Sequence, residues 1–189
     1  DSATDNTKLP LAGGTMTGTL NINNTLPIIK LTDTNSSGYY SSITQEGSSF
    51  KILADEGNVG SGQFRVYVGS GAEKIRILND GKIGVGIAAP DGTLHIHTAS
   101  AGSVAASTNA DDLVIENSGH GGLNILVPDA SYGNVYFGGP NDSDAGRIQY
   151  GGSAVSTTAD RDAMIFSTDA VERLRLNSSG ATITGNVTV

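Results

Sequence analysis

Two histidines separated by a single residue, His95 and His97, are the side chains of this sequence best suited to hold a metal ion. Side chains two apart in a β-strand point to the same side, so both imidazoles would lie on one face. Imidazole nitrogen is a common ligand of first-row metals, and iron or zinc is the metal expected at this pair. Alternation favours another interpretation: with Leu94 and Ile96 facing the core, both histidines are expected to point toward solvent.

Acidic residues occur in close pairs, and two carboxyl groups at a defined separation could serve glycoside hydrolysis. The pairs are Asp55 with Glu56, Asp111 with Asp112, Asp142 with Asp144, and Asp160 with Asp162. Several stand next to or near Asn, Ser or Gly, where Asp side chains commonly hydrogen-bond to the backbone of a turn. The acidic pairs are therefore interpreted as turn-stabilising residues. Because no nucleophile elbow and no phosphate-binding glycine loop occurs either, no enzymatic activity is predicted.

Aromatic and hydrogen-bonding side chains are densest between residues 132 and 150. Ring faces can stack on the C–H groups of sugars while amides and carboxylates bond to sugar hydroxyls. The possible glycan-binding residues are Tyr132, Tyr136, Asn141, Asp142 and Tyr150. Two other interpretations stay open: one ring of Tyr136 and Phe137 packs in a core, or the stretch is only a surface loop.

The composition allows only a thin hydrophobic core. The chain has 189 residues, of which 37% are hydrophobic and 5% aromatic, with 26 Gly and neither Cys nor Trp. A net charge of −8 disfavours nucleic acid and anionic membrane surfaces as partners, because little positive charge is available to neutralise phosphates. No apolar stretch approaches the roughly 20 residues of a membrane span, so no membrane insertion is predicted.

Period-two alternation of apolar residues recurs along the chain, and helical periodicity is nearly absent, which predicts an all-β fold. Glycine-containing turns separate the clearest strands. These strands are 64–68, 75–77, 94–97, 123–127, 135–137 and 174–176.

Internal repeats indicate two copies of one β module. Residues 73–81 recur as 172–180, and the opening 29–33 recurs as 113–117. The second copy carries an insertion, placed in 138–158. A further repeat of 15–22 at 182–189 suggests a segment of a longer modular array. The predicted divisions are an axial β segment 1–26, a first β module 27–86, a connector 87–112, a second β module with the insertion 113–181, and the start of another axial segment 182–189.

Alternation also predicts which side chains of the repeated strands face inward. Ile75 and Ile77 are expected to point inward and Arg76 outward. In the second copy, Leu174 and Leu176 are expected to point inward and Arg175 outward. Glu73 and Glu172 lie on the opposite parity from these arginines. In a regular strand these glutamates and arginines would point to opposite faces, so an ion pair between them within one chain is not expected. The two glutamates are interpreted as solvated residues at strand ends.

Three motifs resemble those of tailed-bacteriophage tail fibres. Residues 9–20 resemble the Leu-Pro-Leu-x-Gly-Gly-Thr-x-Thr-Gly-x-Leu motif, and 172–180 resembles a segment often found upstream of a C-terminal intramolecular chaperone. Residues 84–96 are similar to the Gly-Ile-Gly-Thr-x-x-Pro-x-x-x-Leu-His-Val signature, with Ile87 and Ala88 in place of the usual Gly and Thr. No chaperone domain is recognisable after Val189.

The resemblance implies an elongated homotrimeric β fibre, with two repeated β modules joined by short axial β segments and the apolar residues of three chains meeting on the axis. Six imidazoles from His95 and His97 of three chains would then suit an octahedral metal, as in similar phage fibres and spikes. The implied function is a structural part of a virion tail fibre that contributes to host-surface attachment.

The partners implied by the resemblance are further copies of the chain, other tail proteins, and a host polysaccharide or receptor. A capsule polysaccharide depolymerase and a bacterial surface adhesin are the alternatives. Thin hydrophobicity and repeats also predict that an isolated chain is not stably folded as a monomer.

Overall fold

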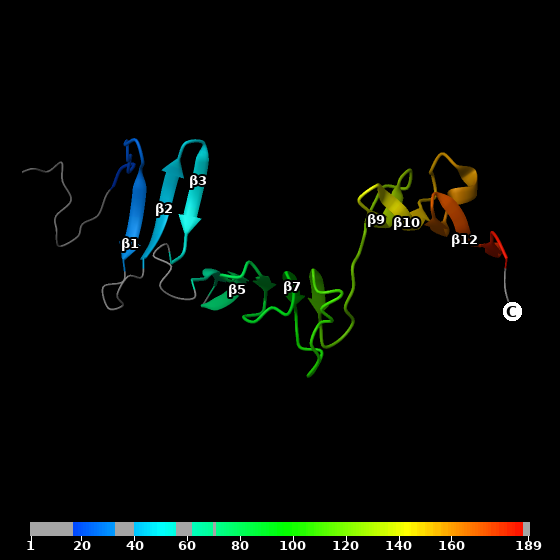
Figure 1. Ribbon diagram of the computed structural model, residues 1–189, viewed down its shortest axis with the longest axis horizontal. Helices are drawn as coiled ribbons and strands as arrows, with labels where there is room; N and C mark the ends of the chain where they lie inside the picture. The colour runs from blue at the N-terminus through cyan, green and yellow to red at the C-terminus, as the bar shows by residue number, and fades with distance from the viewer. Residues whose placement is uncertain (1–16, 33–39, 56–61, 70, 187–189) are drawn as a thin grey trace, which may run out of the picture. The chain divides into compact units, whose positions relative to one another are not determined.

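A computed structural model describes residues 17–32, 40–55, 62–69 and 71–186, and over these residues the protein is all-β (Figure 1). The strands form three sheets, accompanied by a short 3-10 turn at Thr158–Asp160. The chain divides into two compact units, Asp1–Gly121 and Gly122–Val189. Much of the predicted axial segment 1–26, Glu56 and residues 187–189 lie outside the described residues.

The first sheet is antiparallel and contains β1 (Ile28–Thr32), β2 (Tyr40–Glu46) and β3 (Ser49–Leu53) in that order. Its register places Ile29, Ile43 and Ile52 side by side in one row. All three are more than one third exposed. On the other face Ser42 and Thr44 are buried.

The second sheet has the order β4-β5-β6-β7-β8. Its strands are β4 (Phe64–Val68), β5 (Ala72–Ile77), β6 (Ile83–Val85), β7 (Leu94–His97) and β8 (Leu113–Glu116). The first three pair antiparallel, whereas β6, β7 and β8 pair in parallel. Parallel neighbours need a crossover between them, and here the two crossovers contain no helix.

Backbone segments approach closely at two glycines: the first crossover passes over Gly84 of β6, and Gly92 of the first crossover lies against Asp111 of the second. A Cβ at Gly84 would lie 2.3 Å from the Ile87 carbonyl oxygen, and a Cβ at Gly92 would lie 1.8 Å from the Asp111 carbonyl oxygen. Both distances are far below van der Waals contact, so these positions require glycine. The close approach covers the face of the sheet that carries Gly84 and His95.

The opposite face of the second sheet is entirely apolar. The pairing register aligns two rows across all of its strands. One row is Phe64, Ile77, Ile83, Leu94 and Leu113, and the other is Val66, Ile75, Val85, Ile96 and Ile115. None of these side chains is buried. We call these two rows the apolar face of the second sheet.

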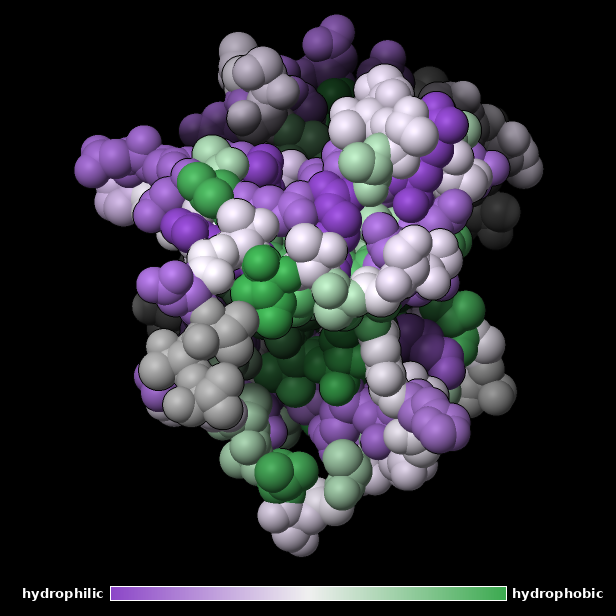
Figure 2. Space-filling view, turned by 90° about the vertical axis from the view of Figure 1, so that its right-hand side faces the viewer, coloured by the Kyte–Doolittle hydropathy of each residue, from purple (hydrophilic) through white to green (hydrophobic). Residues whose placement is uncertain are grey.

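The second unit is an antiparallel sheet in the order β13-β12-β11-β10-β9. Its strands are β9 (Tyr132–Gly139), β10 (Asp142–Gly151), β11 (Ala163–Thr168), β12 (Val171–Asn177) and β13 (Gly180–Ile183). One row across this sheet is Val135, Ile148, Phe166, Leu174 and Ile183. Among the described hydrophobic residues of the whole chain, only Val155, Ala163 and Ile165 are buried. Figure 2 shows hydrophobic side chains, in green, at the surface between hydrophilic ones.

The predicted repeat of 73–81 at 172–180 corresponds to two three-stranded meanders, β4-β5-β6 and β11-β12-β13. The predicted match of the two openings does not extend to the sheets, because β1 and β8 belong to different ones. Each has a β-bulge at the same place, because Lys74 and Arg173 have no partner across the ladder. Ile75 and Ile77 share one face and Arg76 lies on the other, as the alternation predicts, and their inward placement in a trimer stays a prediction. The interpretation of Glu73 and Glu172 as solvated strand ends is wrong, because Glu73 pairs with Arg76 and Glu172 with Arg175. The extra residue of the bulge reverses the parity, so that Glu73 reaches Arg76 on the same face.

Three predicted segments have a different structure. Residues 123–127 belong to no strand of the described chain. The predicted insertion 138–158 continues the β9–β10 hairpin, with a short turn at Pro140 and Asn141. The predicted connector 87–112 contains β7, which lies between β6 and β8 in the second sheet.

Candidate functional site

His95 lies at the centre of a polar cluster in the second sheet and is fully buried. Its Nδ1 accepts a hydrogen bond from the backbone N–H of Asp91 at 3.2 Å. A neutral His95 therefore carries its proton on Nε2, which lies 3.1 Å from Oε2 of Glu116. The two groups are close enough to attract each other, but their directions do not meet hydrogen-bond geometry. Among the described residues, His95 Nε2 has no other partner.

Glu116 joins this cluster to the second crossover. Its Oε1 accepts the backbone N–H of Ala101 at 2.7 Å, and its Oε2 lies 3.9 Å from His97 Nε2. The Ala101 amide, assisted by the Ser100 hydroxyl and the two imidazoles, holds the pKa of Glu116 below its ordinary value, although burial acts in the opposite direction. Sequence reasoning missed Glu116. Only the parallel register, which places Glu116 beside His97, brings it to the histidines.

The expectation that both histidines face solvent is wrong for His95. The alternation itself is as predicted, since Leu94 and Ile96 lie on the apolar face, but the crossovers bury the face that carries the histidines. His97 is partly covered there, with 20% of its side chain exposed. Among the described residues, no three His, Asp or Glu side chains are grouped so that they could hold a metal ion. Iron or zinc at His95 and His97 of three chains stays a prediction.

The possible glycan-binding residues divide between two faces and a turn of the third sheet. Tyr132 and Tyr136 alternate on one face of β9, whereas Tyr150 pairs with Gly133 and lies on the other. Asn141 is in the turn between β9 and β10, and Asp142 accepts the Asp144 backbone N–H there at 3.1 Å. That bond is the turn-stabilising role expected of the acidic residues. No single patch contains all five residues.

The face with Tyr132 and Tyr136 carries a polar network. The Tyr132 hydroxyl donates to Asp160 at 2.9 Å, and Gln149 donates to Asn134 at 2.8 Å. Tyr136 is 50% exposed and pairs with Arg147 across the ladder. Neither Tyr136 nor Phe137, which is 58% exposed, packs in a core of this chain. Tyr136 therefore remains available to a ligand.

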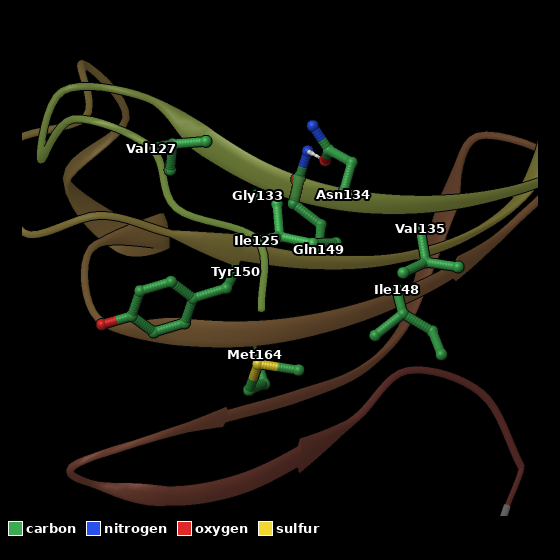
Figure 3. A pocket seen from close by; sticks show the side chains of 9 residues that line it. All are labelled: Ile125, Val127, Gly133, Asn134, Val135, Ile148, Gln149, Tyr150 and Met164. Carbon is green, nitrogen blue, oxygen red and sulfur yellow. Dashed lines mark hydrogen bonds between the residues drawn. The ribbon is translucent and has the colours of Figure 1, made fainter. Parts of the chain in front are cut away.

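Tyr150 lines a shallow apolar hollow of about 160 Å³ (Figure 3). Ile125 and Val127 lie on one side of the hollow and Met164 on another. The Tyr150 hydroxyl donates to Asp162 at 3.2 Å. Burial, together with Asp162, raises the pKa of this hydroxyl. The hollow could take an apolar group. The amides of Asn134 and Gln149, which also line it, are hydrogen-bonded to each other.

Each meander also carries a compact charged cluster on its polar face. In the first, Glu73 receives hydrogen bonds at 2.6 Å from both Arg65 and Arg76. In the second, Arg175 contacts Glu172 and lies 2.8 Å from Asp160. These arginines and carboxylates neutralise one another. The polar faces therefore offer no free catalytic pair at these positions.

No helix among the described residues is long and apolar enough to cross a membrane. No family model, no curated protein and no solved structure matches the chain.

Proposed function

We propose that the chain is a structural segment of a bacteriophage tail fibre in the virion, that three copies of it associate, and that it contributes to attachment to the host surface. The motifs at 9–20, 84–96 and 172–180 support the family. The apolar face of the second sheet supports the association and is the observation that carries the proposal.

That face suits self-association for two physical reasons. Burial of the two uninterrupted apolar rows stabilises an assembly by roughly 25 cal/mol for each Å² of apolar surface removed from water. Large exposed apolar patches of this kind mark interaction surfaces. Charged residues of the sheet lie on the opposite face, in the cluster of Glu73, Arg65 and Arg76 and at Glu116 beside the histidines. Copies that meet through the apolar face therefore avoid the repulsion expected between chains of net charge −8.

Attachment would use the exposed polar face of the third sheet, and the partners would be a host polysaccharide or receptor together with other tail proteins. The variants Tyr136→Ala and Tyr150→Ala show which face of the third sheet is used, when adsorption of the intact fibre to host cells is measured for each. Loss of adsorption in Tyr136→Ala but not in Tyr150→Ala would support attachment through the polar face. Unchanged adsorption with both would leave the segment a spacer.

Self-association is tested by the mass of the chain in solution, measured by light scattering. We expect three times the 19.2 kDa of one chain. Ile77→Asp places a charge in the apolar face and should release single chains, whereas Thr108→Asp, on an exposed part of the second crossover, should not. A well-folded wild-type monomer would contradict the proposal.

A further inference from the structure

Residues 121–127 form a segment whose backbone has no partner within the described chain. These residues belong to no strand, and no backbone hydrogen bond between described residues involves them. Unpaired peptide groups are readily satisfied by water, but they also form a ready edge for another strand.

The amino acids of the segment are nevertheless those of a strand. Ile125 and Val127 are β-branched and favour strands, Leu123 and Leu126 add apolar surface, and Pro128 ends the run. Their exposure is high: Leu126 is 84% exposed, the highest value among the large hydrophobic residues described, and Leu123 is 67% exposed. A strand sequence with open backbone and exposed apolar side chains is incomplete as a single chain.

One side of the segment is already held in place. Cγ2 of Ile125 and Cγ2 of Val127 lie 3.6 Å and 4.0 Å from the position that a Cβ would take at Gly133 (Figure 3). The two side chains line the hollow with Tyr150 and Met164. Leu126 is left exposed, so the segment is anchored on β9 while part of it stays open to a partner.

Charge favours a second copy of this chain as that partner. No Asp, Glu, Lys or Arg occurs between residues 117 and 128, although the chain as a whole carries a net charge of −8. The same segment of another copy can therefore approach without like-charge repulsion, and the segment carries no charge that would select an oppositely charged protein.

We propose that residues 123–127 form a strand between copies, by backbone hydrogen bonding to the same segment of a second chain. The inference rests on the self-association proposed above and names a contact separate from the apolar face of the second sheet. Pairing would satisfy the free peptide groups and cover Leu126.

Hydrogen exchange of the assembled full chain tests the backbone pairing. We expect the amides of residues 123–127 to exchange at least about tenfold more slowly than in an unstructured peptide, although the described part of one chain gives them no backbone acceptor. Exchange at the unstructured rate in a protein that light scattering shows to be trimeric would overturn this inference and leave the proposed function standing. A monomeric protein would overturn both.

Disulfide crosslinking identifies the partner, and the absence of cysteine makes the background clean. Leu126→Cys should give a crosslinked two-chain species on a denaturing gel under oxidising conditions. Ser153→Cys is the matched control, because Ser153 is exposed and lies outside the segment. Equal crosslinking of the two variants would overturn the inference, even if the amides are protected.

Discussion

Glu73 organises the polar face of the second sheet, because it accepts hydrogen bonds from Arg65 and Arg76, both at 2.6 Å. Only 17% of its side chain is exposed. The bond from Arg76, assisted by Arg65 and Tyr67, lowers the pKa of Glu73 from 4.5 to about 2, although burial opposes the shift. A carboxyl group whose pKa is lowered by folding stabilises the native state above its unfolded pKa.

Glu73→Gln should therefore change the acid sensitivity of the fold. The wild type loses the contribution of Glu73 as the pH falls from about 4.5 to about 2, and the variant lacks that contribution at every pH. The difference in thermal unfolding midpoint between the two should thus shrink across this window. Glu46→Gln is the control, because Glu46 is 60% exposed in its pair with Lys51 and its loss should matter less. A constant difference between wild type and Glu73→Gln from neutral pH to pH 2 would contradict the assignment.

His95 has a structural role that can be measured without reference to metal. His95→Ala should leave a cavity and free the Asp91 amide, and should lower the free energy of unfolding by about 2–4 kcal/mol in urea at fixed chain concentration. His120→Ala is the control, because His120 is exposed and its loss should change stability by less than about 0.5 kcal/mol. Equal effects of the two variants would show that the buried cluster contributes nothing.

At the scale of elements, the turn between β11 and β12 is strained, because two of its residues other than glycine have a positive φ. Asp169 and Ala170 have φ of +49° and +57°, whereas Gly69 and Gly71, which follow β4, are glycines with a positive φ. Two successive positive φ values suit the tight turn of a hairpin, but an alanine there costs about 1 kcal/mol relative to glycine.

Ala170→Gly should therefore raise the free energy of unfolding by about 1 kcal/mol, again measured in urea at fixed chain concentration. Ala154→Gly is the control. Ala154 is exposed and lacks a positive φ, so glycine there gains no backbone relief and should leave stability unchanged or slightly lower. If Ala154→Gly stabilised the protein as much as Ala170→Gly, backbone strain at Ala170 would not be the cause.

The repeated strands were predictable because alternation and glycine turns are local signals, and Ile75, Arg76 and Ile77 lie on the faces expected. The bulges at Lys74 and Arg173 were not predictable, since an unpaired residue leaves no mark in composition. The burial of His95 was missed for a different reason. It depends on crossovers that pass over one face, and a period-two pattern cannot show which face they cover.

At the scale of the molecule, each of the three sheets exposes a row of apolar side chains. Ile29, Ile43 and Ile52 form such a row in the first sheet, and the other two sheets have longer ones. The sequence predicted the thin core, because 37% hydrophobic residues spread over 189 positions leave little to bury. The sequence did not predict that the two compact units divide between Gly121 and Gly122. The small polar residues of 98–112 resemble a linker and drew the predicted boundary to that stretch.

The close passage of the crossovers over the second sheet limits how the sequence can change during evolution. Any side chain at Gly84 or Gly92 would collide with a backbone carbonyl oxygen of a crossover, so these positions should not accept another residue. Most of residues 99–110, by contrast, are exposed and tolerate replacement. Distant relatives of this fold should therefore keep these two glycines and the buried histidine after most of their surface has diverged.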